Sequence, residues 1–98
     1  METFGSMIRG LRIEKKVPLR KVAAYLDVDQ AILSKLERGQ RRASRAQVIQ
    51  LAAYYRVKEN ELLVAWLSDR LVYEIAGEKV ALKALQAAEE KVKYGKRK

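Results

Sequence analysis

The stretch "VDQAILSKLERGQRR", residues 28–42, decides the fold of this 98-residue chain. Asp29 stands where the N-cap of a helix is expected, and Gly39 stands where that helix would end. Between them, Leu33 and Leu36 fall on one face of the helix, and cations gather directly after the glycine. The stretch is therefore either a solvated helix on a basic protein or a surface that lies against nucleic acid.

Apolar residues recur at helical spacing on both sides of this stretch, and no segment alternates as a strand does. We therefore expect an all-α fold. The expected helices cover roughly residues 3–15, 18–26 and 30–38, then one after the capping box of Ser44 and Gln47, one from near Glu59, and one over 78–93. The expected organisation is a five-helix domain over residues 1–67, a helical extension over 68–93, and a basic, disordered tail over 94–98.

Composition narrows the class of function. The chain has no cysteine and no histidine, so no disulfide, thiol nucleophile or histidine base is available, and its acidic residues show no pairing suited to catalysis. We expect no catalytic residue, no metal site and no cofactor. The longest apolar run, residues 62–67, is too short to cross a membrane, and a cytoplasmic protein is expected by default.

The net charge of +9 is unevenly placed along the chain. Residues 1–57 hold 12 Lys and Arg against 5 Asp and Glu, residues 58–90 hold 4 against 7, and the last eight hold 5 against none. A basic field of this kind attracts polyanions such as DNA or RNA, although a solubilising surface would have a similar composition.

The two short helices 18–26 and 30–38 are joined by about three residues, so they must cross steeply. Ala23 supplies a small residue for the close approach. The apolar positions on either side of the turn are Val22, Leu26, Val28, Leu33 and Leu36. This pattern is typical of a helix-turn-helix, in which the second helix enters the major groove.

Residues 4–67 resemble the phage repressor and Cro-like helix-turn-helix domains, often called the XRE family. The matching stretches are "IRGLRIEKKVPLRKVAAYLDVDQAILSKLERGQRR" and "QVIQLAAYYRVKENELL", and "LSKLERG" is the most specific part. The resemblance implies a repressor-like domain that regulates transcription by binding a pseudo-palindromic site in double-stranded DNA as a homodimer. A small protein of this kind is also similar to the controller proteins of restriction–modification systems.

The resemblance also implies roles for individual residues. It pairs Arg12 with Glu37 in a buried ion pair. It assigns base contacts to the first turns of the third helix, at Gln30, Ala31, Ile32, Ser34 and Lys35. Phosphate contacts are expected from Arg20, Arg38, Arg41, Arg42 and Arg45. The chain departs from the family at Asp27, where glycine is common, and at Leu19, where a phosphate-binding glutamine is common; Arg20 is the candidate replacement for that contact.

The extension holds more apolar residues than one small core needs. We expect part of this set, namely Trp66, Leu71, Val72 and Ile75, to close a dimer, the alternative being that the sixth helix folds back on the fifth. A rival function is a protein-interaction module, such as an antitoxin or a methyltransferase-associated partner, with autoregulatory or vestigial DNA binding. No small-molecule ligand is expected.

Overall fold

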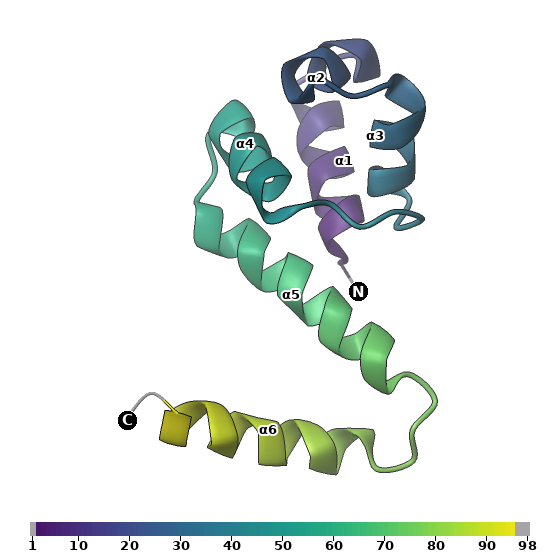
Figure 1. Cartoon of the computed structure of the whole chain (residues 1–98). Helices are drawn as coiled ribbons and strands as arrows, with labels where there is room; N and C mark the ends of the chain where they lie inside the picture. The colour runs from purple at the N-terminus through teal and green to yellow at the C-terminus, as the bar shows by residue number, and fades with distance from the viewer. Residues whose placement is uncertain (1, 96–98) are drawn as a thin grey trace.

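The computed structural model describes residues 2–95, and within that range it contains six α-helices and no strand (Figure 1). The helices are α1 (Phe4–Glu14), α2 (Leu19–Leu26), α3 (Gln30–Glu37), α4 (Arg45–Tyr55), α5 (Glu59–Ile75) and α6 (Ala81–Gly95). The predicted all-α class is confirmed, and the predicted helix ends differ from those observed by a few residues at most.

Two capping boxes explain where α1 and α4 begin. The Thr3 hydroxyl accepts from Ser6 N at 3.1 Å, and the Ser6 hydroxyl accepts from Thr3 N at 2.9 Å. Ser44 and Gln47 exchange the same two bonds at 3.1 and 2.9 Å. These bonds satisfy backbone N–H groups that a helix start otherwise leaves unpaired. The boxes therefore define the entry of the chain into both helices.

The first five helices enclose one apolar core, with α1 running through the middle of the group (Figure 1). Its largest fully buried side chains come from every one of these helices: Ile8, Val22, Leu33, Leu36, Val48, Leu51, Tyr55 and Leu62. We call residues 4–66, which contain every buried apolar residue of the described range, the body.

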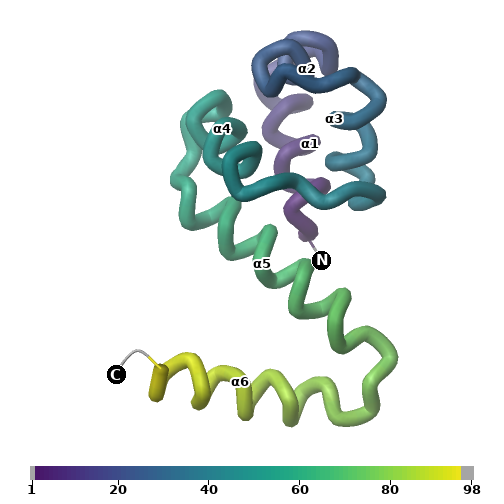
Figure 2. Tube along the Cα trace, in the orientation of Figure 1, coloured from purple at the N-terminus to yellow at the C-terminus, as the bar shows by residue number. Residues whose placement is uncertain are grey.

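The second half of α5 leaves the body, and α6 turns back below it without joining its core (Figure 2). We call residues 67–95 the arm. No residue of α6 is buried. Two residues of the predicted disordered tail, Tyr94 and Gly95, belong to α6, where Lys93 in the last turn favours continuation of the helix by interacting with its dipole. Residues 96–98 lie outside the described residues.

Candidate nucleic-acid interface

The turn between α2 and α3 is built by backbone hydrogen bonds and one left-handed residue. Asp27 has φ 58° and ψ 47°, the conformation that glycine adopts most easily. Val28 N donates to Ala23 O at 3.0 Å, and Asp27 N donates to Ala24 O at 3.1 Å. Asp29 occupies the N-cap position of α3, but its side chain makes no capping bond. The predicted helix-turn-helix is therefore present, with its turn held by the backbone.

The two faces of α3 differ sharply. Leu33, Leu36 and Glu37 are buried against the body. Of the residues predicted to contact bases, Gln30, Ala31 and Lys35 are exposed, whereas Ile32 and Ser34 are partly buried. Ile32 was expected to contact bases, and only part of its side chain is exposed. The outward face of α3 therefore carries polar side chains beside the small apolar Ala31.

Glu37 is the one charged residue buried in the body, and Arg12 of α1 reaches it from inside. Arg12 Nε lies 2.8 Å from Glu37 Oε2, and Nη2 lies 3.1 Å from Oε1. Arg12 Nη1 also donates to Val17 O at 3.3 Å. The side chains are only 17 % and 4 % exposed, and the hydrogen bonds that Arg12 donates to Glu37 raise the pKa of Arg12 despite the opposing effect of burial. This two-point pair locks the C-terminal end of α3 to α1.

Tyr55 of α4 lies in the same part of the core. Burial raises the pKa of its phenol well above the usual range, and the negative charge of Glu37 raises it further. Its hydroxyl has no hydrogen-bond partner among the described residues. Tyr55 thus contributes packing, including an edge-on contact with the Tyr54 ring at 5.2 Å between centroids.

Gly5 lets α1 approach the end of α3, a role that sequence analysis missed. A Cβ placed on Gly5 would lie 2.5 Å from Glu37 O and 2.7 Å from Leu36 O, both of them backbone atoms. The only signal in the sequence was a small residue between the core positions Phe4 and Ile8. Gly5 therefore allows the close approach of α1 to the C-terminal end of α3.

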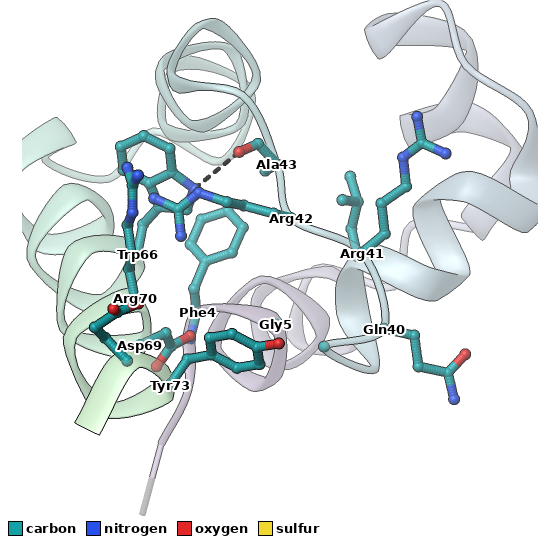
Figure 3. Close-up of a pocket in the computed structure, with 13 residues that line it drawn as sticks. Phe4, Gly5, Gln40, Arg41, Arg42, Ala43, Trp66, Asp69, Arg70 and Tyr73 are labelled. Atoms are coloured by element: carbon teal, nitrogen blue, oxygen red, sulfur yellow. Dashed lines mark hydrogen bonds between the residues drawn. The ribbon is translucent and has the colours of Figure 1, made fainter. Parts of the chain in front are cut away.

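The predicted phosphate-contacting arginines are all exposed, but they point in different directions. Arg20 lies on α2, and Arg38 Nε folds back to Ser34 O at 3.3 Å. Arg41 points away from α5, whereas Arg42 points toward it (Figure 3). The guanidinium carbon of Arg42 lies 4.3 Å from the ring centroid of Trp66, and that of Arg45 lies 5.5 Å from the same ring.

The structure corrects the role that was predicted for Trp66. Sequence analysis assigned it to a dimer interface, but its side chain is 8 % exposed and belongs to the core of the body. Its indole Nε1 donates to Ala43 O at 2.9 Å, in the loop between α3 and α4 (Figure 3). A tryptophan that is already enclosed adds little to an interface with a second chain.

The other predicted dimer residues lie on the arm. Leu71 and Val72 are 53 % and 60 % exposed, and Ile75 is partly buried. Just before them, Asp69 Oδ2 accepts from Phe4 N at 2.9 Å and so joins α5 to the start of α1. Sequence analysis did not single out Asp69, because a lone carboxylate on an exposed helix carries no local signal of such a distant partner.

A cavity of about 490 Å³ lies between the α3–α4 loop and α5, with Phe4, Leu36 and Trp66 among its lining residues (Figure 3). Residues 2–95 contain no group of three or more His, Cys, Asp or Glu that could hold a metal ion. Within the same range, no helix combines the length and the apolar character that crossing a membrane requires.

A family model described as helix-turn-helix, HTH_3, matches residues 8–62. Among solved structures, the chain is similar to the crystal structure of the clp gene regulator ClgR from Corynebacterium glutamicum, with 25 % sequence identity and a TM-score of 0.58. The match covers 93 % of this chain and 83 % of that chain. No curated protein sequence matches the chain.

Proposed function

The chain belongs to the helix-turn-helix family HTH_3 and is a DNA-binding transcriptional regulator, and from that premise we propose that it acts as a homodimer on a pseudo-palindromic operator. The observation that carries the proposal is the outward face of α3, with Gln30 and Lys35 exposed, which the Arg12–Glu37 pair holds on a packed body. A cytoplasmic, non-enzymatic protein is part of the proposal.

We propose that the first turns of α3 read the bases. The exposed Gln30 amide can form two hydrogen bonds with an adenine edge, and the Lys35 ammonium can donate to guanine acceptors. Ala31 and the exposed part of Ile32 can contact a thymine methyl, and Ser34 can contact either kind of base edge. Because α3 is anchored by its opposite face, these groups would enter the major groove as one rigid unit.

We assign phosphate contacts to the cations around this helix. Arg20 on α2 and Arg38 at the end of α3 border the recognition helix, and Arg41, Arg42 and Arg45 follow it in the loop and in α4. In the described residues, none of these guanidinium groups forms an ion pair. They are therefore available for phosphate oxygens, which fix the position of a domain on DNA without reading its sequence.

The arm supports the homodimer part of the proposal. An isolated helix of 15 residues is marginal in water, and α6 buries no residue within its own chain. Large apolar residues remain exposed along the arm at Leu67, Leu71, Val72, Tyr73, Val80, Leu82 and Val92. A second copy that packs against this surface would bury it on both chains, as two-fold symmetric interfaces do.

A salt series tests the proposal as a whole. Binding of the purified protein to a selected duplex and to random duplexes is measured by fluorescence anisotropy across salt concentrations. We expect affinity to fall steeply with salt for both, and the selected site to be preferred by ~10³-fold or more. Equal affinity for all duplexes would leave the protein-interaction module, an antitoxin or methyltransferase partner, as the better explanation.

Sedimentation analysis tests the dimer separately. Leu71→Glu places a charge on the exposed surface of the arm and should shift the protein to monomer. Val64→Glu is the matched control, because Val64 is also exposed on α5 but lies in the body. A wild-type protein that sediments as a monomer at micromolar concentration would contradict the homodimer.

A further inference from the structure

Trp66 occupies an unusual position for a core residue, because one side of it meets the basic loop that follows α3. Its ring is buried by the body, and its Nε1–H bond to Ala43 O ties the ring to the backbone directly after Arg42 (Figure 3). The guanidinium groups of Arg42 and Arg45 both approach this ring, at 4.3 and 5.5 Å from its centroid. One buried aromatic side chain thus lies against two arginine guanidinium groups.

This contact with the ring leaves the N–H donors of the guanidinium group available for hydrogen bonds. A guanidinium group that lies over an aromatic ring uses its face, while its N–H donors point outward in the plane of the group. Among the described residues, neither Arg42 nor Arg45 forms an ion pair, so their donors are not taken up by a carboxylate. The arrangement holds two cations in place and leaves their hydrogen-bonding edges for a partner.

The fixed position matters because a free arginine side chain loses rotamer entropy when it binds. A side chain that is stacked beforehand loses less on binding. Arg41 provides the contrast within the same loop, since its side chain points away from Trp66 (Figure 3). The loop therefore contains an arginine that lies over the ring next to one that does not.

We propose that Trp66 is a positioning residue for DNA binding: its ring orients Arg42 and Arg45 to contact the phosphate backbone of the duplex. This inference rests on the proposed function, because it needs a duplex to which the two arginines bind. It also places the phosphate-binding loop in direct contact with α5, the helix that continues into the arm. Trp66 acts through the arginines and reads no sequence itself.

Lysine substitutions separate stacking from charge. Arg42→Lys keeps the positive charge but loses the planar group, and a stacked site does not tolerate this exchange well. We expect Arg42→Lys to weaken binding by about 2- to 5-fold, the range that a cation–π contact supports at an exposed position. The loss should be the same for selected and random duplexes, and the salt slope should stay unchanged because the charge is retained.

Two other variants serve as references. Arg41→Lys should lose less affinity than Arg42→Lys, because Arg41 is not stacked on the ring. Arg9→Lys, at an exposed position of α1 outside the proposed interface, should leave affinity unchanged. Equal losses for Arg41→Lys and Arg42→Lys would overturn the role of Trp66.

A double-mutant cycle identifies Trp66 as the cause. In a Trp66→Leu protein shown to be folded by circular dichroism, Arg42→Lys should have no further effect on affinity. A loss equal to that seen in the wild-type background would overturn the proposal. If Trp66→Leu does not fold, the comparison of Arg42→Lys with Arg41→Lys decides alone. If the wild-type protein does not bind duplex DNA, both the proposed function and this inference are overturned. If the wild-type protein binds and Arg42→Lys does not weaken binding, only this inference is overturned.

Discussion

The body and the arm use apolar side chains in opposite ways. In residues 4–66 the apolar side chains of five helices meet in one core, and the single buried carboxylate is paired by an arginine. Residues 67–95 are also helical for most of their length. However, α6 contains no buried residue, and Leu71 and Val72 of α5 remain exposed. The body therefore has an intramolecular explanation for its stability, whereas the exposed apolar side chains of the arm are those that we propose a second chain buries.

The largest effect should follow from breaking the ion pair of the body. Arg12→Met leaves Glu37 buried without a partner, and removing one member of a buried pair typically costs about 3–5 kcal/mol. Urea denaturation measures this loss in the free energy of unfolding. Arg9→Met, on the exposed side of the same helix, should change stability by no more than about 0.5 kcal/mol. Similar values for the two variants would show that the pair does not hold α3.

Two glycines on α1 test how closely this helix packs against α3. Gly5→Ala brings a methyl group against the backbone of α3 and should destabilise the protein by about 1–3 kcal/mol, as overpacking does. Gly10→Ala meets no atom within 4 Å and should stabilise it by about 0.5–1 kcal/mol through helix propensity. Thermal unfolding of both variants distinguishes close packing from propensity. Stabilisation by both would show that α1 has room to move.

Substitutions on the outward face of α3 test whether its side chains discriminate between DNA sequences. Gln30→Ala and Lys35→Ala should each reduce discrimination between the preferred and a mismatched site by about 1–3 kcal/mol. Arg42→Ala should weaken binding to all duplexes alike. Competition binding with matched and mismatched duplexes measures both quantities. If Arg42→Ala changed sequence preference instead, the division between base and phosphate contacts would be wrong.

Much of the body could be predicted from sequence, because its signals are local. The Ser44–Gln47 box, the apolar spacing of α2 and α3, and the glycine after α3 each act within a few residues. The Arg12–Glu37 pair came from the family resemblance, and its two side chains meet as the resemblance implied.

The residues that were missed or misassigned depend on distant partners. Asp69 bonds a backbone N–H 65 positions away, and Gly5 meets carbonyl groups of α3. Trp66 was placed in a dimer interface because an apolar helix face looks the same whether its partner is another helix or another chain. Only the three-dimensional packing shows that the α3–α4 loop covers this ring.

Substitution of Tyr55 should have a smaller effect on the free energy of unfolding, and this effect should depend on pH. Tyr55→Phe removes a buried hydroxyl without a partner among the described residues and should stabilise the body by about 1 kcal/mol at neutral pH. The raised pKa of Tyr55 means that the unfolded chain loses the phenol proton first, near pH 10, so wild-type stability should fall as pH rises above about 10. The variant should lose less stability over this range in urea denaturation. Equal alkaline losses would contradict the burial of Tyr55.

Removal of α6 should have the smallest effect on folding. A chain that ends at residue 76 retains every buried apolar residue, so its free energy of unfolding should differ by less than about 1 kcal/mol from that of the full chain in monomeric form. Urea denaturation at low protein concentration makes this comparison. Unfolding of the shortened chain would show that the body depends on α6 for its stability.

Selection of DNA fragments by the purified full-length protein, followed by sequencing, tests the central claim most directly. We expect enrichment of two inverted copies of a short sequence, with centres about 34–36 Å or a multiple of that distance apart. This result would match a homodimer that presents two α3 helices to successive major grooves. Fragments without any shared sequence, or with a single unsymmetric motif, would contradict it.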